Sequence, residues 1–501
     1  MKTTSTALVA LCLLNWASCS KTECPREEQD AAVGEESFAE IPLLVETEYG
    51  PVRGVIGDSS RIFRGIAYAA PPVGALRFAA PQPPKKWSEP PEPVPTLCPQ
   101  FSEEVVTGII GDEACLTLDV WTPIKAPDGL LPVMVWIHGG GYTAGSGYLA
   151  EAFLPTRDVI VVAVNYRLGV LGFLAHPALT EEGGGTSGNY GIEDQRFALE
   201  WVRDNIEAFG GDPDNVTIFG ESAGGAAVAS QLWSSRSAGL FHRAIMQSGN
   251  LFGRGVKTLE DAEAQGERLA AALACDTEPD VVDCLRSLSF DQLLNAPIVA
   301  SYRPCFDGVV FEKEFLTAIK NREINLVPTM VGSNSLEGLG FVLDLVDMTE
   351  EQYIDRIETT YPENADELLS LYPVSKYITP QYAYSAMMSH GSFNCSCRRA
   401  ARALTEAGAD VYLYYYSWGW AFHAAELALL FGVGAFPEEQ VVSSALKDYW
   451  TQFAKTGNPN GGELPQWPRF ETESESYMNI GFSIEAGSGF LRDECDFWDE
   501  L

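Results

Sequence analysis

A serine between two glycines is the residue of this chain best placed for nucleophilic chemistry. Residues 220–224 read Gly-Glu-Ser-Ala-Gly and directly follow the apolar run 216–219. Because glycines at 220 and 224 have no side chain to collide with neighbouring backbone, a tight strand-to-helix turn could hold Ser222 exposed at the top of a sheet. The same pattern also occurs in ordinary turns, so the surrounding residues must decide between the two interpretations.

A nucleophilic serine needs a base, and the chain offers five histidines. In proteins that use this turn for catalysis the partners follow in the order nucleophile, acid, histidine, so the base is expected late in the chain. His390 has no strand before it and is expected on the surface. His423 follows the strand-like run 411–416 and begins an apolar helical stretch. We therefore predict His423 as the base.

The acid that orients this base is expected after a strand that lies between the serine and the histidine in the sequence. The run 327–332 has the composition of such a strand, and the loop 332–338 then carries one carboxylate, Glu337. A single Glu among many acidic residues means little by itself. Its position after a strand and before Gly338 singles out Glu337.

Donors for a developing oxyanion are expected on a glycine loop. The apolar run 131–137 leads into His-Gly-Gly-Gly-Tyr at 138–142, where consecutive glycines let backbone N–H groups turn toward one point. A plain glycine turn after a strand is the alternative.

Elements around the serine have the periodicity of an α/β protein. Residues 192–209 have apolar side chains at helical spacing, and Gly-Gly-Asp-Pro at 210–213 ends that helix. The run 216–219 is typical of a short buried parallel strand, and the small residues of 223–232 predict a helix packed closely on it. The local order is helix, turn, strand, serine turn, helix.

Composition limits the class of protein and its partners. The 501 residues are 46% hydrophobic and 11% aromatic, enough for a large core, and no repeat or low-complexity tract divides them. A formal net charge of −36 disfavours nucleic acid and anionic membranes as partners and would attract cations.

The N-terminus resembles a secretory signal, with an apolar run at 7–14 and small residues before a cleavage point after Cys19. An uncleaved anchor and a lipid-modified Cys19 are the alternatives, but the run is too short to span a bilayer, and no other stretch predicts a stable span. We expect a signal peptide at 1–19, an acidic arm at 20–40 and one domain at 41–501. Secretion is therefore predicted, with the endoplasmic reticulum lumen as alternative because the chain ends in Asp-Glu-Leu.

Cysteines and sequons fit that route. Loss of Cys12 and Cys19 from the eleven cysteines leaves an odd number, so some are expected to pair and at least one to stay free. Two sequons begin at Asn215, which could be too buried for a glycan, and at Asn394.

These motifs resemble the type-B carboxylesterases, a family that includes cholinesterases, fungal lipases, bacterial para-nitrobenzyl esterases and the non-catalytic neuroligins. The resemblance covers nearly the whole chain after the N-terminal arm. It begins at Gly-Pro-Val-Arg-Gly at 50–54 and Phe-Arg-Gly-Ile-Ala-Tyr-Ala at 63–69, and it reaches Cys-Asp-Phe-Trp at 495–498. Its most specific part is Gly-Asn-Tyr-Gly-Ile-Glu-Asp-Gln at 188–195, which runs on through Phe-Gly-Gly-Asp-Pro at 209–213 into the serine turn at 220–224.

The resemblance implies an α/β-hydrolase fold, a mostly parallel central sheet flanked by helices, and ester hydrolysis through an acyl-enzyme intermediate without cofactor or metal. It implies that Glu221 lies beside the site in a supporting role. The remaining site residues that it implies are a triad of Ser222, Glu337 and His423 and an oxyanion hole formed by the N–H groups of Gly140, Gly141 and Ala223.

The resemblance also implies disulfides. Cys495 would pair with Cys395 or Cys397, of which Cys395 fits better, and the state of Cys24, Cys305 and the remaining partner stays open. The other implied pairs are Cys98 with Cys115 and Cys275 with Cys284.

Departures from the family bear on the substrate. The loop between Cys98 and Cys115 is short and lacks the tryptophan that stacks on choline in cholinesterases. A short loop also argues against the lid of the lipases, and the segment after His423 resembles the bacterial His-Ala-x-Glu form. We expect an esterase whose substrates are small, uncharged, apolar esters. The sequence does not specify the oligomeric state of the protein. A neuroligin-like binding module and an interfacial lipase are the alternatives.

Overall fold

The computed structural model describes residues 43–57, 60–92, 96–102, 108–125, 129–147, 157–252, 256–298, 301–432 and 436–501. The expected signal peptide at 1–19, the acidic arm at 20–40 and Cys24 lie outside the described residues. Within the described ranges, no helix has both the length and the apolar character needed to cross a membrane.

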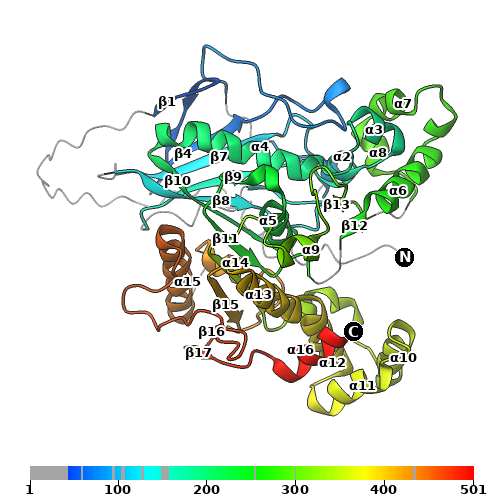
Figure 1. Cartoon of the computed structure of the whole chain (residues 1–501), viewed down its shortest axis with the longest axis vertical. Helices are drawn as coiled ribbons and strands as arrows, with labels where there is room; N and C mark the ends of the chain where they lie inside the picture. Colours follow the sequence, from blue (N-terminus) through cyan, green and yellow to red (C-terminus); the bar gives the residue numbers. More distant parts are fainter. Residues whose placement is uncertain are drawn as a thin grey trace, which may run out of the picture.

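A single large sheet organises the chain (Figure 1). It has 11 strands in the order β17-β16-β15-β14-β11-β10-β8-β9-β7-β4-β3. All neighbours from β16 to β9 pair in parallel, and the outer pairs at both edges are antiparallel. The strands are β3 (Val55–Ile56), β4 (Ser60–Ala67), β7 (Thr117–Pro123), β8 (Leu131–Ile137), β9 (Ile160–Val164), β10 (Gly211–Glu221), β11 (Arg243–Gln247), β14 (Thr329–Asn334), β15 (Val411–Tyr416), β16 (Tyr477–Ile480) and β17 (Ile484–Gly487).

Helices cover both faces of this sheet, as the sequence predicts. Side chains of a strand alternate between its faces, so Val133 and Val135 of β8 enter one buried cluster while Met134 and Trp136 enter another. The first cluster also holds apolar side chains of α4 (Tyr190–Asn205), α5 (Ala223–Trp233) and α13 (Cys395–Ala407). The second holds those of α14 (Ala425–Leu430) and α15 (Pro437–Thr456).

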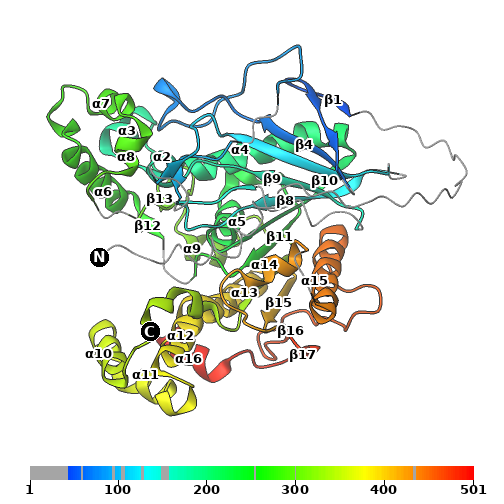
Figure 2. The ribbon, with the colours of Figure 1, turned by 180° about the vertical axis from the view of Figure 1, so that it is seen from behind.

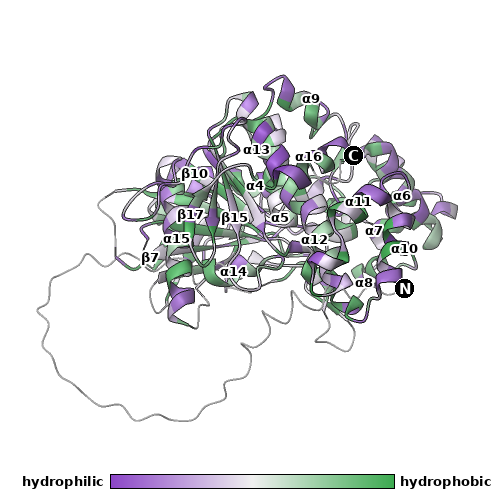
Figure 3. Cartoon of the chain, turned by 90° about the horizontal axis from the view of Figure 1, so that it is seen from below, coloured by the Kyte–Doolittle hydropathy of each residue, from purple (hydrophilic) through white to green (hydrophobic). Residues whose placement is uncertain are grey.

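Two further groups of helices project on the same side of the sheet, and Figures 1 and 2 show them from opposite directions. Each group has its own buried cluster. In Figure 3 these outer helices carry alternating green and purple bands, as expected for amphipathic helices with one apolar face. The first group consists of α2 (Gly169–Phe173), α3 (Pro177–Glu182), α6 (Leu259–Ala272), α7 (Val281–Ser287) and α8 (Phe290–Leu294). The second group consists of α10 (Glu350–Thr360), α11 (Ala365–Leu371) and α12 (Pro380–Ser389), and α16 (Arg492–Glu500) lies near it.

Element boundaries near the serine differ modestly from expectation. The strand predicted at 216–219 belongs to the longer β10, and the helix predicted to Phe209 ends as α4 at Asn205, followed by a 3-10 turn. His390 was expected on the surface, but it lies half-buried in a π-helical turn, and its Nδ1 lies 3.1 Å from the hydroxyl oxygen of Tyr372.

The disulfides have the pairing that the resemblance implies, including Cys395 rather than Cys397 as the partner of Cys495. Cys305 and Cys397 are buried free thiols. Disulfides of this number fit an oxidising, non-cytosolic compartment. The three pairs are Cys98–Cys115, Cys275–Cys284 and Cys395–Cys495.

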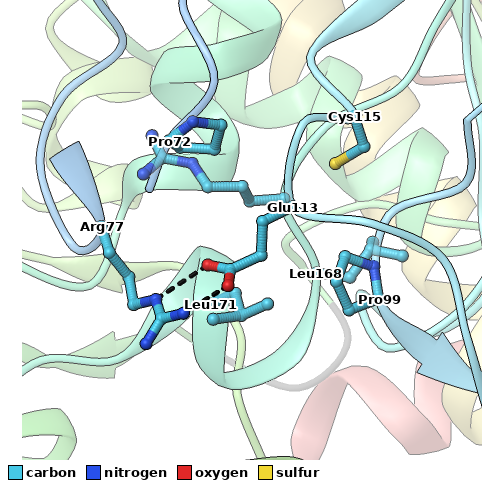
Figure 4. A pocket seen from close by; sticks show the side chains of 8 residues that line it. Pro72, Arg77, Pro99, Glu113, Cys115, Leu168 and Leu171 are labelled. Atoms are coloured by element: carbon cyan, nitrogen blue, oxygen red, sulfur yellow. Dashed lines mark hydrogen bonds and ion pairs between the residues drawn. The ribbon is translucent and has the colours of Figure 1, made fainter. Parts of the chain in front are cut away.

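A buried ion pair anchors the loop that the first disulfide closes. Nε of Arg77 donates to Oε2 of Glu113 over 2.8 Å, and Nη2 donates to the other carboxylate oxygen. Figure 4 shows this pair beside Pro72 and Leu171, in a hollow with no internal volume for a water molecule. The Glu113 end of the loop is therefore fixed to the body of the protein.

The sequon at Asn394 is not available for a glycan in the folded chain. Asn394 is fully buried, and its amide nitrogen donates to the Ser333 hydroxyl over 2.8 Å and to the Asn334 carbonyl over 2.9 Å. Asn215 is only partly buried, and its side-chain oxygen accepts a hydrogen bond from Arg243. The Asn394 amide therefore supports the end of β14 instead of facing solvent.

Candidate active site

Ser222 lies at the sharp turn between β10 and α5. Its φ of 57° and ψ of −121° lie in a region that costs a non-glycine residue about 1–3 kcal/mol. A Cβ at Gly220 or Gly224 would lie 2.5 or 2.1 Å from the carbonyl oxygen of Ile137 on the neighbouring strand. Both glycines are therefore required by close backbone packing, and this is the turn that the sequence predicts.

Ser222, His423 and Glu337 form a continuous chain of hydrogen bonds. Nε2 of His423 lies 2.8 Å from the Ser222 hydroxyl oxygen, and Nδ1 lies 2.6 Å from Oε2 of Glu337. His423 is 6% exposed and Glu337 is fully buried. Ser222 and His423 are 201 residues apart in the sequence, yet they meet at one point together with Glu337.

Strand order explains how residues so distant in sequence meet. The loops that follow β10, β14 and β15 leave the same edge of the sheet because these strands are parallel. The loops after β14 and β15 also pair with each other, since Leu336 N–H donates to the Ala421 carbonyl over 2.8 Å and Ser335 N–H donates to the Tyr416 carbonyl over 2.8 Å. The loops that carry Glu337 and His423 are therefore held in register by backbone hydrogen bonds.

The glycine loop after β8 lies against the serine turn. A Cβ at Gly139 would lie 3.2 Å from Cβ of Ser222. Gly140 and Gly141 have φ values of 98° and 65°, and within the described part of the chain their N–H groups donate no hydrogen bond. The N–H of Ala223, at the first position of α5, has no carbonyl one turn earlier to bond. Three backbone donors are thus available near Ser222.

His138 supports this glycine loop and does not take part in proton transfer with Ser222. It is buried, its ring stacks on Tyr166 at 4.4 Å, and the Tyr166 hydroxyl donates to the His138 carbonyl over 2.8 Å. Burial lowers the pKa of His138 to about 4, so the ring is neutral at physiological pH.

Glu221 is a second buried carboxylate beside the base. Its Oε1 lies 3.3 Å from Nε2 of His423. Burial, followed by the charges of Glu426 and Glu337, raises the pKa of Glu221 to about 8, although His423 acts in the opposite direction. Burial alone would lower the pKa of His423, but the charges of Glu221 and Glu337 outweigh it and raise this pKa above its usual value.

Sequence reasoning gave no role to a third carboxylate, Glu426, or to the amides that bind it. Glu426 is fully buried, and it accepts hydrogen bonds from Gln247 Nε2 over 3.0 Å and Asn334 Nδ2 over 2.6 Å. Asn334 Nδ2 also donates to the Phe422 carbonyl over 2.8 Å, and its N–H donates to Glu337 Oε1 over 2.7 Å. Asn334 therefore connects the acid, the loop of the base and Glu426. The His-Ala-x-Glu spacing was the only sequence signal for this set.

Two half-buried phenylalanines contact the base. The ring centroids of Phe341 and Phe393 lie 5.1 and 4.8 Å from that of His423, and the two rings stack on each other at 5.8 Å. They form an apolar wall beside the hydrogen-bonded chain. In the described residues, no group of three or more His, Cys, Asp or Glu side chains has an arrangement that could hold a metal ion.

Comparison with known proteins agrees with this geometry. Residues 42–498 match the model of the carboxylesterase family. Liver carboxylesterase 1 of Oryctolagus cuniculus is 32% identical, over 92% of this chain and 93% of the relative. The medium-chain fatty acyl-CoA hydrolase precursor of Anas platyrhynchos has the same identity and coverage, and fumonisin B1 esterase of Sphingopyxis macrogoltabida is 32% identical over 89% of this chain and 88% of the relative. A mostly parallel sheet flanked by helices and a match over nearly all of the chain show that this protein belongs to the carboxylesterase family, with the α/β-hydrolase fold and carboxylic ester hydrolase activity.

Proposed function

We propose that Ser222, His423 and Glu337 are the catalytic triad of this esterase and that hydrolysis proceeds through an acyl-enzyme. The observation that carries the proposal is the unbroken chain of contacts, 2.8 Å from Ser222 Oγ to His423 Nε2 and 2.6 Å from His423 Nδ1 to Glu337 Oε2. Distances of this size allow His423 Nε2 to take the Ser222 proton without rearrangement, while Glu337 holds the ring by its hydrogen bond to Nδ1.

In the first half of the reaction, His423 Nε2 takes the hydroxyl proton while Ser222 Oγ bonds to the ester carbonyl carbon. Glu337 holds the ring and stabilises its positive charge. The N–H groups of Gly140, Gly141 and Ala223 stabilise the oxyanion, each contributing about a hundredfold or more in rate. His423 then gives its proton to the leaving alkoxide, so that alcohol and acyl-enzyme form.

In the second half, water replaces the alcohol. His423 takes a proton from this water as its oxygen attacks the acyl carbon, and returns that proton to Ser222 Oγ as the carboxylic acid leaves. Glu221 lies close enough to His423 to keep the imidazolium stable throughout both halves. Its role is to position and stabilise the base, and it forms no bond to substrate.

The preferred substrates are small, uncharged, apolar esters. Phe341 and Phe393 give the site an apolar wall. Three buried carboxylates, Glu221, Glu337 and Glu426, disfavour an anionic group next to the reacting carbonyl. Relatives are named for substrates as different as fatty acyl-CoA and fumonisin B1, so their names do not narrow the choice for this chain.

The compartment is the secretory pathway, with release from the cell as the expected destination and the lumen of the endoplasmic reticulum as alternative. Three disulfides support an oxidising compartment. The two destinations separate in a fractionation experiment, in which secretion predicts activity in the culture medium.

Hydrolysis of a p-nitrophenyl ester series from acetate to palmitate tests the site and the substrate class together. We expect Ser222→Ala to lower kcat/KM by about 10⁴-fold or more, and the exposed-serine control Ser88→Ala to retain wild-type rates. Equal turnover by wild type and Ser222→Ala would reject the triad. Short acyl chains are expected to react fastest, and a jump in activity when a long-chain ester forms droplets would instead favour an interfacial lipase.

A further inference from the structure

A cavity lies at the end of α5 opposite to the catalytic serine. Its volume is about 290 Å³, close to the lower limit of typical small-molecule sites. It opens between the C-terminal end of α5, the 3-10 turn Ser235–Ser237, the helix α9 (Phe315–Lys320) and the residues that follow α9. Figures 1 and 2 both show α9 beside α5. The lining residues are Trp233, Ser235, Ala238, Glu312, Lys313, Ala318, Glu323, Ile324 and Asn325.

The floor of this cavity is aromatic and fixed. Trp233 is 3% exposed, and its ring stacks on Phe311 at 3.9 Å with an interplanar angle of 9°. Phe315 packs against it edge-on at 5.4 Å. The indole N–H donates to the Lys313 carbonyl over 2.8 Å. Because the indole has both ring contacts and a hydrogen bond, the cavity is formed without any ligand.

The rim of the cavity is negative. Glu323 forms an ion pair with Lys313 and accepts a second hydrogen bond from Asn321 over 3.2 Å. Glu312 accepts a hydrogen bond from the Ser235 hydroxyl over 3.0 Å, and no cation within the described residues forms an ion pair with it. One carboxylate at the rim is therefore left without a positive partner.

We propose that this cavity is a second ligand site, separate from the catalytic serine, for a small organic cation with an apolar body, such as an arylalkylammonium ion. The apolar part lies against Trp233, Ala318 and Ile324, and the ammonium group pairs with Glu312. The net charge of −36 raises the local concentration of such cations around the protein.

The site adjoins the C-terminal end of the helix that begins after Ser222. Asn325 lines the cavity and binds the last carbonyls of α5, with N–H donating to Leu232 over 2.8 Å and Nδ2 donating to Gln231 and Ser234 over 2.9 and 2.8 Å. The 11 residues of α5 separate the cavity from Ser222 by about 16 Å. The proposed site therefore adjoins the C-terminal end of α5 and lies apart from the space that the ester would occupy.

Isothermal titration calorimetry with benzylammonium chloride at low ionic strength tests this site. Ala238→Phe fills the cavity from an exposed position, and Ala271→Phe places the same side chain on the exposed face of α6 as its control. We expect Ala238→Phe to weaken binding at least about tenfold, as loss of most of the apolar contact requires. Ala271→Phe should bind as wild type does.

A second pair of variants tests the charge. Glu312→Gln removes the unpaired carboxylate, and Glu406→Gln is the control at an exposed position of α13. We expect Glu312→Gln to weaken binding about two- to fivefold, as for an exposed ion pair. Added salt should reduce this difference, and benzoate should bind much more weakly than benzylammonium.

Three results would overturn the proposal. In the first, neither Ala238→Phe nor Glu312→Gln changes the affinity for benzylammonium. In the second, benzoate binds as tightly as benzylammonium. In the third, benzylammonium no longer binds once Ser222 is blocked with an organophosphonate. The last result would place the cation in the catalytic site. Retained binding after this block, together with unchanged kcat/KM of Ala238→Phe for p-nitrophenyl acetate, would support a separate site.

Discussion

Replacement of Glu221 by glutamine changes the charge beside the base while keeping the shape of the side chain. In the proposed mechanism His423 acts as a base only when its ring is neutral, so kcat/KM is expected to rise as pH rises through its pKa in the free enzyme. The charge of Glu221 raises this pKa. Glu221→Gln is therefore expected to lower it and to move the acid limb of the pH profile to lower pH.

The size of this shift follows from the separation of the two groups. At 3.3 Å, two unit charges interact by about 1.3 kcal/mol in bulk water and by about 5 kcal/mol at an effective dielectric constant of about 20. Because burial raises the pKa of Glu221 to about 8, its carboxyl carries only a fraction of a unit charge near neutral pH. Only part of the larger energy is therefore expressed, and about a quarter of it corresponds to a shift of about one pH unit.

Initial rates with p-nitrophenyl acetate, followed at the isosbestic wavelength of p-nitrophenol, give the profile of kcat/KM against pH. Glu207→Gln, at an exposed position after α4, removes one charge far from the base and serves as the control. An acid limb that stays at the wild-type pH in Glu221→Gln, or moves to higher pH, would refute the electrostatic role of Glu221.

Asn334→Ala removes one of the two side-chain donors to the buried carboxylate of Glu426 and the donor to the Phe422 carbonyl, while Gln247 still binds Glu426. We expect urea denaturation to show a loss of about 2–4 kcal/mol in unfolding free energy, with a lower kcat, and unchanged stability would contradict this. Replacing Cys395 and Cys495 together by alanine opens a loop of 100 residues, for which we expect a loss of about 4–5 kcal/mol in the same assay. Asn394 should carry no glycan, and peptide mass analysis of protein from a glycosylating host checks this, since a glycan there would require the amide to leave its buried site.

The chemistry of the site could be predicted from sequence because each part has a local signature. The serine turn needs glycines at 220 and 224, where a Cβ would strike the neighbouring strand. Likewise, Glu337 and His423 each follow a run of strand-forming residues. Parallel order then brings these loops to one edge of the sheet, so local patterns together with the family resemblance were sufficient to predict the fold class and the candidate triad.

Other features depend on contacts between distant segments and have no local signature. Asn394 has a sequon in the sequence, yet its amide is buried because α13 packs against the end of β14. The carboxylate of Glu426 is held by Gln247 and Asn334, which lie 179 and 92 residues away in the sequence. The cavity at the end of α5 likewise arises from packing against α9. Such features can be identified only when the three-dimensional arrangement of these distant segments is known.

The backbone conformation of Ser222 lowers the stability of the fold while it places the side chain for activity. A φ of 57° suits glycine better than any residue with a side chain, so Ser222→Gly relieves about 1 kcal/mol or more of conformational strain while removing the nucleophile. Stability and activity therefore oppose each other at this position. Serine at this position therefore carries a cost in conformational free energy that glycine would not, and the hydroxyl is what this cost retains.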